Sequence, residues 1–123
     1  YNATTGACVS SVNNAAYSAN APSGVVYHPQ TNKLLMTKST DSAIYTMNID
    51  GSSPTVAYLN TSRVQTPYSI AVDSSGYVYV SANGQDTIEK FSFDGTTLTL
   101  ATTGPLIGPN LYTQNPTQIW VIP

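Results

Sequence analysis

The stretch that decides the fold runs from Pro67 to Gly95 and reads PYSIAVDSSGYVYVSANGQDTIEKFSFDG. Short runs of β-branched and aromatic residues, which favour strands, are separated in it by residues that favour turns, such as those at 74–76. Residues 88–93 alternate in character, so successive side chains are expected on opposite faces of a strand. The Asp94-Gly95 pair that follows is the strongest short hairpin signal in the chain. The stretch therefore predicts an antiparallel meander.

The same pattern occurs 45 residues earlier, where Pro22 aligns with Pro67. The Asp-Gly pairs of the two copies also align after one deletion, and Pro116 begins a third copy 49 residues after Pro67. Self-similarity at a fixed period indicates a repeat architecture. The predicted units are a partial one over residues 1–21, full ones over 22–66 and 67–115, and the first strand of a further one over 116–123.

Each full unit is expected to hold four strands. The first is a continuous apolar run, Val25–Tyr27 or Ile70–Val72, as in strands that are covered on both faces, and the later ones are increasingly polar. Four antiparallel strands per unit of about 45 residues, with the most buried strand innermost, describe a blade of an all-β propeller. The other predicted strands are 34–36, 44–49 and 55–59 in one unit, 77–80, 88–93 and 97–101 in the next, and 8–12 in the partial unit.

Residues 67–95 resemble an NHL-type propeller repeat, because they carry the elements P-x-x-I-A-V-D, G-x-V-Y-V and D-x-I-x-x-F-x-x-D-G. The unit that starts at Pro22 is similar but looser. Its segment IYTMNIDGSS, residues 44–53, also resembles the YWTD blade of the low-density lipoprotein receptor, whose third strand likewise runs into D-G-S. The resemblance covers nearly the whole chain. It implies a propeller and leaves the function open, because such propellers include lyases, lactonases, scaffolds and receptors.

The length of the chain predicts an incomplete propeller, because 123 residues make only about 2.7 such units. An open arrangement of blades leaves strand edges and a blade face uncovered. These surfaces could be covered in three ways: by further sequence of a larger propeller, by a ring that several chains share, or by a head-to-tail filament. The predicted assembly contacts are Ile119, Trp120 and Val121, which would join the N-terminal strands of a neighbour.

Composition narrows the classes of function. Charged residues make up 8% of the chain, against about 25% in an average soluble protein, while Ser, Thr and Asn supply 41 of the 123 residues. This hydroxyl-rich polarity predicts a secreted or cell-surface protein. Four basic residues and a net charge of −2 argue against nucleic acid as a partner. No apolar run approaches the roughly 18 residues that span a membrane.

Three residues are candidates for covalent modification or bridging. Cys8 is the single cysteine, so no disulfide can form within the chain. We expect a half-buried thiol. The alternative is a disulfide bridge to another chain, which would make Cys8 an assembly contact. Asn2 and Asn60 each begin an N-x-[ST] sequence and are candidate glycosylation sites. Chance matches are expected in a chain this rich in Asn, Ser and Thr.

No residue is assigned a catalytic, cofactor-binding or metal-binding role. His28 ends a first strand, which lines the central channel in propellers, and could act there as a base or metal ligand. Because no second ligand stands at a suitable spacing, a polar strand-end residue is the preferred interpretation. Asp50, Asp73 and Asp94 precede Gly or Ser and are expected to accept hydrogen bonds from backbone amides in turns.

Two further groups have both a structural and a functional interpretation. Asp41, Asp86 and Glu89 are expected near the loops between second and third strands, where a calcium site is the alternative, although their spacing is unlike an EF-hand loop. Most tyrosines are expected to pack between blades, and a minority to form a sugar-stacking or protein-contact surface. The segment 105–110 is the predicted variable contact loop.

The sequence therefore predicts an extracellular, non-catalytic structural or binding module without a cofactor, which assembles with copies of itself or belongs to a larger surface protein. One alternative is a fragment of a lactonase or lyase propeller with a channel metal, which would need several His or acidic residues in the channel. The other is a glycan-binding lectin, which would repeat an aromatic residue in each unit. The single His counts against the enzyme, and the alignment of Tyr27 with Val72 counts against the lectin.

Overall fold

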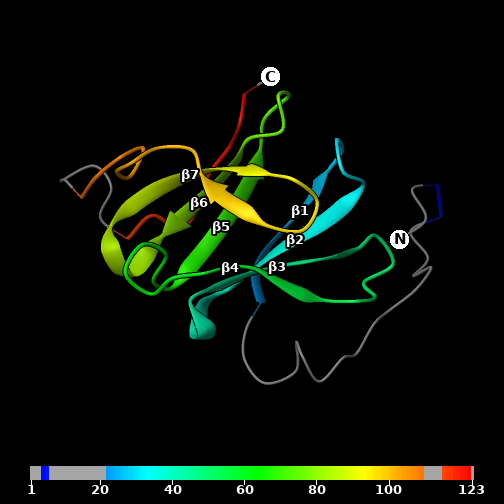
Figure 1. Ribbon diagram of the computed structural model, residues 1–123, viewed down its shortest axis with the longest axis horizontal. Helices are drawn as coiled ribbons and strands as arrows, with labels where there is room; N and C mark the ends of the chain where they lie inside the picture. The colour runs from blue at the N-terminus through cyan, green and yellow to red at the C-terminus, as the bar shows by residue number, and fades with distance from the viewer. Residues whose placement is uncertain (1–3, 6–21, 110–114, 123) are drawn as a thin grey trace.

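The computed structural model describes residues 4–5, 22–109 and 115–122. Within these ranges, eight strands form two four-stranded antiparallel sheets, each with its strands in chain order (Figure 1). The all-β fold of four-stranded meanders is thereby confirmed. The first sheet contains β1 (Pro22–His28), β2 (Lys33–Lys38), β3 (Ala43–Asn48) and β4 (Thr55–Leu59), and the second contains β5 (Pro67–Val72), β6 (Val78–Ala82), β7 (Thr87–Phe93) and β8 (Leu98–Leu100).

The two sheets repeat each other in their turns as well as in their strands. Each has a short 3-10 turn between its second and third strands, η1 (Ser39–Asp41) or η2 (Asn83–Gln85), followed by a residue in the left-handed conformation. Between the third and fourth strands, Gly51 and Gly95 have φ angles of 82° and 100°, which glycine adopts without strain. The Asp-Gly pairs thus turn the chain as predicted.

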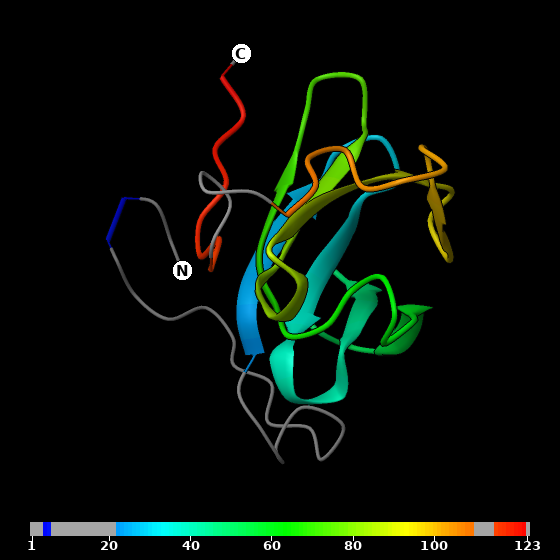
Figure 2. The ribbon, with the colours of Figure 1, turned by 90° about the vertical axis from the view of Figure 1, so that its left-hand side faces the viewer.

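The sheets pack against each other around a core that both supply (Figure 2). Leu35 and Ile44 of the first sheet and Phe91 of the second are fully buried in it, and Val64 joins them from the linker between the sheets. The ring of Tyr58 packs edge-on against Phe91, with 4.8 Å between the centroids. Burying a large apolar side chain stabilises a fold by about 1.5–3 kcal/mol, so this shared core holds the two units together.

The first strands of the two sheets, β1 and β5, lie side by side (Figure 1). The Oγ of Ser23 donates a hydrogen bond to the carbonyl of Pro67 at 2.7 Å, and Thr37 Oγ1 donates to the carbonyl of Tyr68 at 3.2 Å. A Cβ atom on Gly24 would lie 2.9 Å from the same Tyr68 oxygen, so a residue without a side chain lets the strands approach this closely. Adjacent first strands are the arrangement found around the axis of a propeller.

The prediction that the first strand is the most buried is wrong for β1. Val25 is 64% exposed and Tyr27 is 49% exposed, whereas most side chains of β2 and β3 are buried. Successive side chains of a strand point to opposite faces, and Val26 and His28 are the ones covered. The prediction assumed cover on both faces, but the described residues place a second sheet on only one of them.

The predicted strand at Ile119–Val121 is also not formed, since residues 116–122 adopt no strand pairing. The segment nevertheless runs alongside β5, where the Ile119 N–H donates to Ser69 Oγ at 3.1 Å (Figure 2). A single bond to a side chain does not make a strand, because a ladder needs backbone partners along its edge. That 116–123 begins a further unit stays a prediction.

Candidate functional site: a pocket at the ends of the inner strands

A pocket lies at the ends of the inner strands. It has a volume of about 470 Å³. Tyr27, Val72 and Val121 line it, and they are the fifth residues after Pro22, Pro67 and Pro116. Three residues at equivalent positions of the sequence pattern therefore surround a common space, as expected at the end of a propeller channel. The remaining lining residues are Val26, Pro29, Asp73, Ser74 and Ile122.

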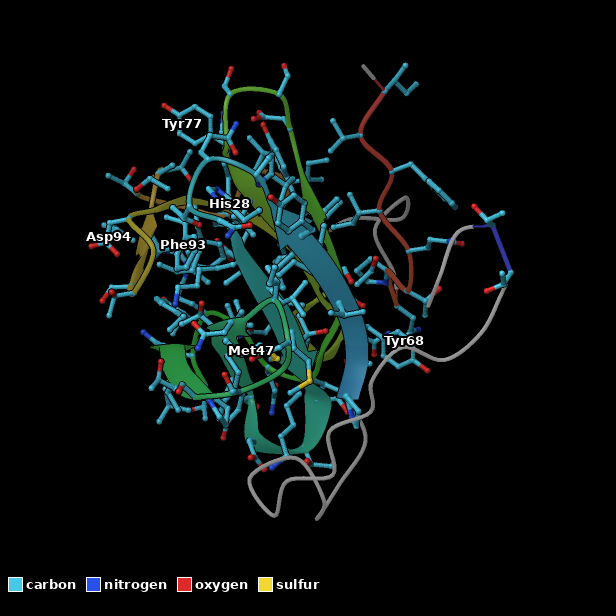
Figure 3. All side chains as sticks on the ribbon, turned by 90° about the vertical axis from the view of Figure 1, so that its right-hand side faces the viewer. His28, Met47, Tyr68, Tyr77, Phe93 and Asp94 are labelled. Carbon is cyan, nitrogen blue, oxygen red and sulfur yellow. The ribbon has the colours of Figure 1, made fainter. Side chains whose placement is uncertain are left out.

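His28 follows Tyr27 but turns away from this pocket into the contact between the sheets. Only 1% of its surface is exposed, and its ring meets Phe93 edge-on at 5.0 Å (Figure 3). Its Nε2 lies 2.9 Å from the carbonyl oxygen of Gly76, and its Nδ1 lies 2.9 Å from the hydroxyl of Thr31. The carbonyl can only accept, so Nε2 carries the proton. Both ring nitrogens are thus occupied in joining β1 to the β5–β6 turn.

Asp73 lines the pocket, but its carboxylate accepts hydrogen bonds from the turn that follows it. Oδ1 accepts the N–H groups of Ser75 and Tyr77, each at 2.9 Å, and Oδ2 accepts the Tyr79 hydroxyl at 2.9 Å. Partial burial acts to raise the pKa of Asp73, but these hydrogen bonds outweigh it and hold the pKa below its ordinary value. The group stays ionised, and its acceptor positions are largely taken, so it is poorly placed to serve as a base.

The other two turn aspartates behave in the same way. Asp50 Oδ1 accepts the N–H of Ser52 at 2.9 Å, and this residue is the main cause of the lowered pKa of Asp50. Asp94 Oδ1 accepts the N–H groups of Thr97 at 2.7 Å and Thr96 at 2.8 Å, which lower the pKa of Asp94. The predicted structural role of all three aspartates in turns is confirmed.

The three remaining carboxylates do not converge. Asp41 lies 2.5 Å from the Lys38 ammonium, whose hydrogen bond is the main cause of the lowered Asp41 pKa, and Asp86 accepts the N–H of Asn115 at 2.7 Å. Glu89 was expected near a loop but is buried within β7. Among the described residues, no three His, Cys, Asp or Glu side chains lie close enough to hold a metal ion.

The ion pair between Arg63 and Glu89 is a feature that sequence reasoning missed. Arg63 stands in the linker between the sheets, and its Nη2 and Nε donate to the two carboxylate oxygens of Glu89 at 2.6 and 3.3 Å. This hydrogen-bonded contact raises the pKa of Arg63. The only sequence signal was an acidic residue at an inward position of an otherwise apolar alternation, and nothing in the linker marked its partner.

The tyrosines divide between packing and surface roles. Tyr58 packs within the core, as predicted for contacts between blades, and its burial raises the pKa of its hydroxyl. Tyr77 and Tyr79 face Lys90, whose ammonium lies 4.0 and 5.4 Å from their ring centroids. Tyr27 remains half exposed at the pocket, with its hydroxyl donating to Asn32 at 3.0 Å.

Of the predicted modification and assembly residues, Val121 lines the pocket, and the others lie apart from it or outside the described residues. Asn60 is exposed just after β4, where its side-chain oxygen accepts the N–H of Ser62 at 2.9 Å. Trp120 is 78% exposed on the C-terminal segment. Asn2 and Cys8 lie outside the described residues, and their predicted roles stay predictions. No helix in the described ranges is long and apolar enough to cross a membrane.

Two four-stranded meanders packed against each other, with their first strands adjacent, are blades of a β-propeller that the described residues do not close. A family described as a beta-propeller repeat (SBBP) matches residues 56–88, which run from β4 through the linker into β7. Among 33 matching solved chains is one in a crystal structure of a nidogen/laminin complex. It has a TM-score of 0.56 and 22% sequence identity, over 67% of this chain and 31% of that chain.

This chain therefore spans about a third of the length of that solved chain. At this identity the likeness concerns the fold. No curated protein matches the chain by sequence.

Proposed function

We propose that the chain is a non-catalytic propeller module of an extracellular protein, which binds through blade completion. The blade sequences favour the NHL or YWTD type of repeat, and the hydroxyl-rich composition favours a secreted or cell-surface location. The solved relative in a nidogen/laminin complex fits a propeller with protein partners. The pocket at the ends of the inner strands favours a binding role over a catalytic one, because structural hydrogen bonds occupy both His28 and Asp73.

The observation that carries the proposal is the position of the C-terminal segment. In the first sheet, side chains near Gly24 bond to the backbone of β5. Ser69 stands at the position of Gly24 in the second sheet, and its Oγ accepts the Ile119 N–H. Residues 116–122 thus meet β5 at the position where the first sheet meets β5 from the other side. This contact supports the proposal that the segment continues the row of inner strands, although none of the described strands pairs with it.

The outer side of this segment is suited to strand addition. Trp120 is 78% exposed and Ile122 is 90% exposed, although Ile122 also borders the pocket beside Val121. Exposed extended backbone with large apolar side chains is a template for pairing with another strand. In this proposal, strands that add to the edge formed by residues 116–122 complete the blade. A second copy of the chain or further propeller sequence would supply them.

Native mass spectrometry and sedimentation of the chain across a range of concentrations test the proposal. Assembly into particles larger than the 13.0 kDa monomer is expected, and replacing Trp120 with alanine should reduce it. Ile49→Ala is the matched control, because Ile49 is an exposed apolar residue of the β3–β4 turn, away from the C-terminal segment. A stable, folded monomer at every concentration would rule out completion by a second copy, and equal effects of both variants would rule out this edge.

A further inference from the structure

A second cavity, lined mostly by polar residues, lies where the linker between the sheets meets β7 and the loop after β8. Its volume is about 220 Å³. Arg63 of the linker and Glu89 of β7 lie on one side of it, Thr87 begins β7 beside them, and Pro105 and Pro109 supply apolar surface. None of these residues belongs to the pocket at the inner-strand ends or to the C-terminal segment, so an inference drawn here does not rest on blade completion.

The Arg63–Glu89 pair has hydrogen-bonding capacity left over. A guanidinium has five N–H donors, of which three are used: two on Glu89 and one, from Nη1, on the Thr103 carbonyl at 3.1 Å. A carboxylate offers about four acceptor positions, of which Arg63 occupies two. The pair therefore keeps donors and acceptors side by side. Two neighbouring hydroxyl groups, each able to accept one hydrogen bond and donate another, are complementary to this arrangement.

Thr87, which lines the same cavity, also carries a buried hydroxyl without a described partner. It is 6% exposed, and its Oγ1 has no hydrogen-bond partner among the described residues. Buried hydroxyls without partners are uncommon in folded proteins and usually indicate an unseen polar neighbour. Thr46 Oγ1 is also buried without a hydrogen-bond partner among the described residues, but Thr46 lines neither of the two pockets. It therefore provides a matched control for the effect of the hydroxyl alone.

The charge and size of the cavity restrict its occupant. The opposite charges of Arg63 and Glu89 compensate each other at 2.6 Å, so the cavity favours a neutral ligand over an ion. The two prolines supply apolar lining against which the C–H groups of a saturated ring can pack. The volume corresponds to about seven water molecules at roughly 30 Å³ each, enough for one small ring. We propose that this cavity binds a neutral polyol of monosaccharide size, with two adjacent hydroxyls held by the Arg63–Glu89 pair.

Nuclear magnetic resonance titrations of the ¹⁵N-labelled full chain test this proposal. The probes are myo-inositol, methyl glucoside and cis-1,2-cyclohexanediol, raised to tens of millimolar. Saturable shifts are expected at the Arg63 Nε–H and at the Thr87 amide. Cyclohexanol is the matched control ligand, because it has the same ring but lacks the second hydroxyl, and it should bind at least about threefold more weakly.

Two valine variants separate ligand binding from folding. Thr87→Val should weaken polyol binding by about three- to tenfold, the loss expected for one hydrogen bond, while Thr46→Val should leave it unchanged. Both variants keep the shape of the side chain, and melting curves verify that they fold. Three outcomes would overturn the proposal: no saturable shift with any polyol, equal affinity for cyclohexanol and the diol, or the same binding in both variants. Any of them would mean that the cavity holds only water.

Discussion

Replacing Gly24 with alanine tests how closely the inner strands of the two blades approach each other. An added Cβ would lie 2.9 Å from the Tyr68 carbonyl oxygen, 3.1 Å from Thr37 Oγ1 and 3.3 Å from Ile70 Cγ2, whereas ordinary contacts begin near 3.4 Å. The nearest atom belongs to the backbone of β5, so the clash cannot be relieved by a side-chain rotation. We expect β1 and β5 to move apart by about half an ångström.

This movement sets the size of the effect. The Thr37 Oγ1 bond to Tyr68, now 3.2 Å, would stretch beyond hydrogen-bond range, and a net protein hydrogen bond contributes about 1 kcal/mol. A gap of this size also forfeits a quarter to a half of the dispersion attraction along the contact. Overpacking of this kind costs about 1–3 kcal/mol. Removing a glycine from the unfolded chain returns roughly 0.4–1 kcal/mol, so a net loss of about 1–2 kcal/mol is expected.

Urea denaturation measures this loss as a change in the midpoint at constant slope. Gly104→Ala is the control, because a Cβ there would meet no atom within 4 Å, and it should leave the midpoint unchanged or raise it slightly. If Gly24→Ala lowers the free energy of unfolding no more than Gly104→Ala does, the close approach of β1 to β5 is wrong.

Three further predictions concern charges and buried hydroxyls. Arg63→Met should lower the free energy of unfolding by about 3–5 kcal/mol, because it leaves the buried Glu89 carboxylate unpaired, and the double variant Arg63→Met/Glu89→Met should recover most of this loss. Urea unfolding of the wild type, both single variants and the double variant measures this, and losses that simply add would contradict the pairing. The pKa values of Asp50, Asp73 and Asp94 are lower in the folded state than in the unfolded chain. These carboxylates therefore stabilise the fold fully above their unfolded pKa of about 3.9, and this stabilisation is lost as the pH falls through their folded pKa values. Urea midpoints should therefore fall steeply below about pH 4, and less steeply in Asp73→Asn; an unchanged acid profile in that variant would argue against its role. Thr46→Val removes a buried hydroxyl without a described partner and should leave stability unchanged or raise it by about 1 kcal/mol on a thermal melt, whereas a loss would reveal a hydrogen bond at that hydroxyl.

Much of the architecture could be predicted from local patterns. The spacing of Pro22 and Pro67 and the two Asp-Gly pairs indicated a four-stranded unit, and each of the eight strands lies where a run of strand-forming residues predicted it. These features depend on neighbouring residues, since turns and strand alternation are decided within a few positions of the chain. The roles of the turn aspartates could be predicted for the same reason.

The candidate site could be predicted only in part. Counting from the opening prolines places Tyr27, Val72 and Val121 at one repeat position, but only the folded chain brings them around a pocket. His28 was expected to be a polar strand-end residue, with a channel base or metal ligand as the alternative, and its ring turns between the sheets to bond with Gly76. The orientation of a side chain at a strand end depends on which neighbour offers a hydrogen-bond partner, and that neighbour stands 48 residues away in the sequence.

The sequence by itself determined the repeating unit, its strands and its turns, because those follow from periodicity and from residues a few positions apart. Only the tertiary structure decided which faces of the strands are covered. β1 carries the apolar run of a fully buried strand but is open on one side, and the single acidic residue of β7 is buried against a linker arginine 26 residues away. Burial and ion pairing depend on how two sheets pack, and a pattern within one sheet does not contain that information.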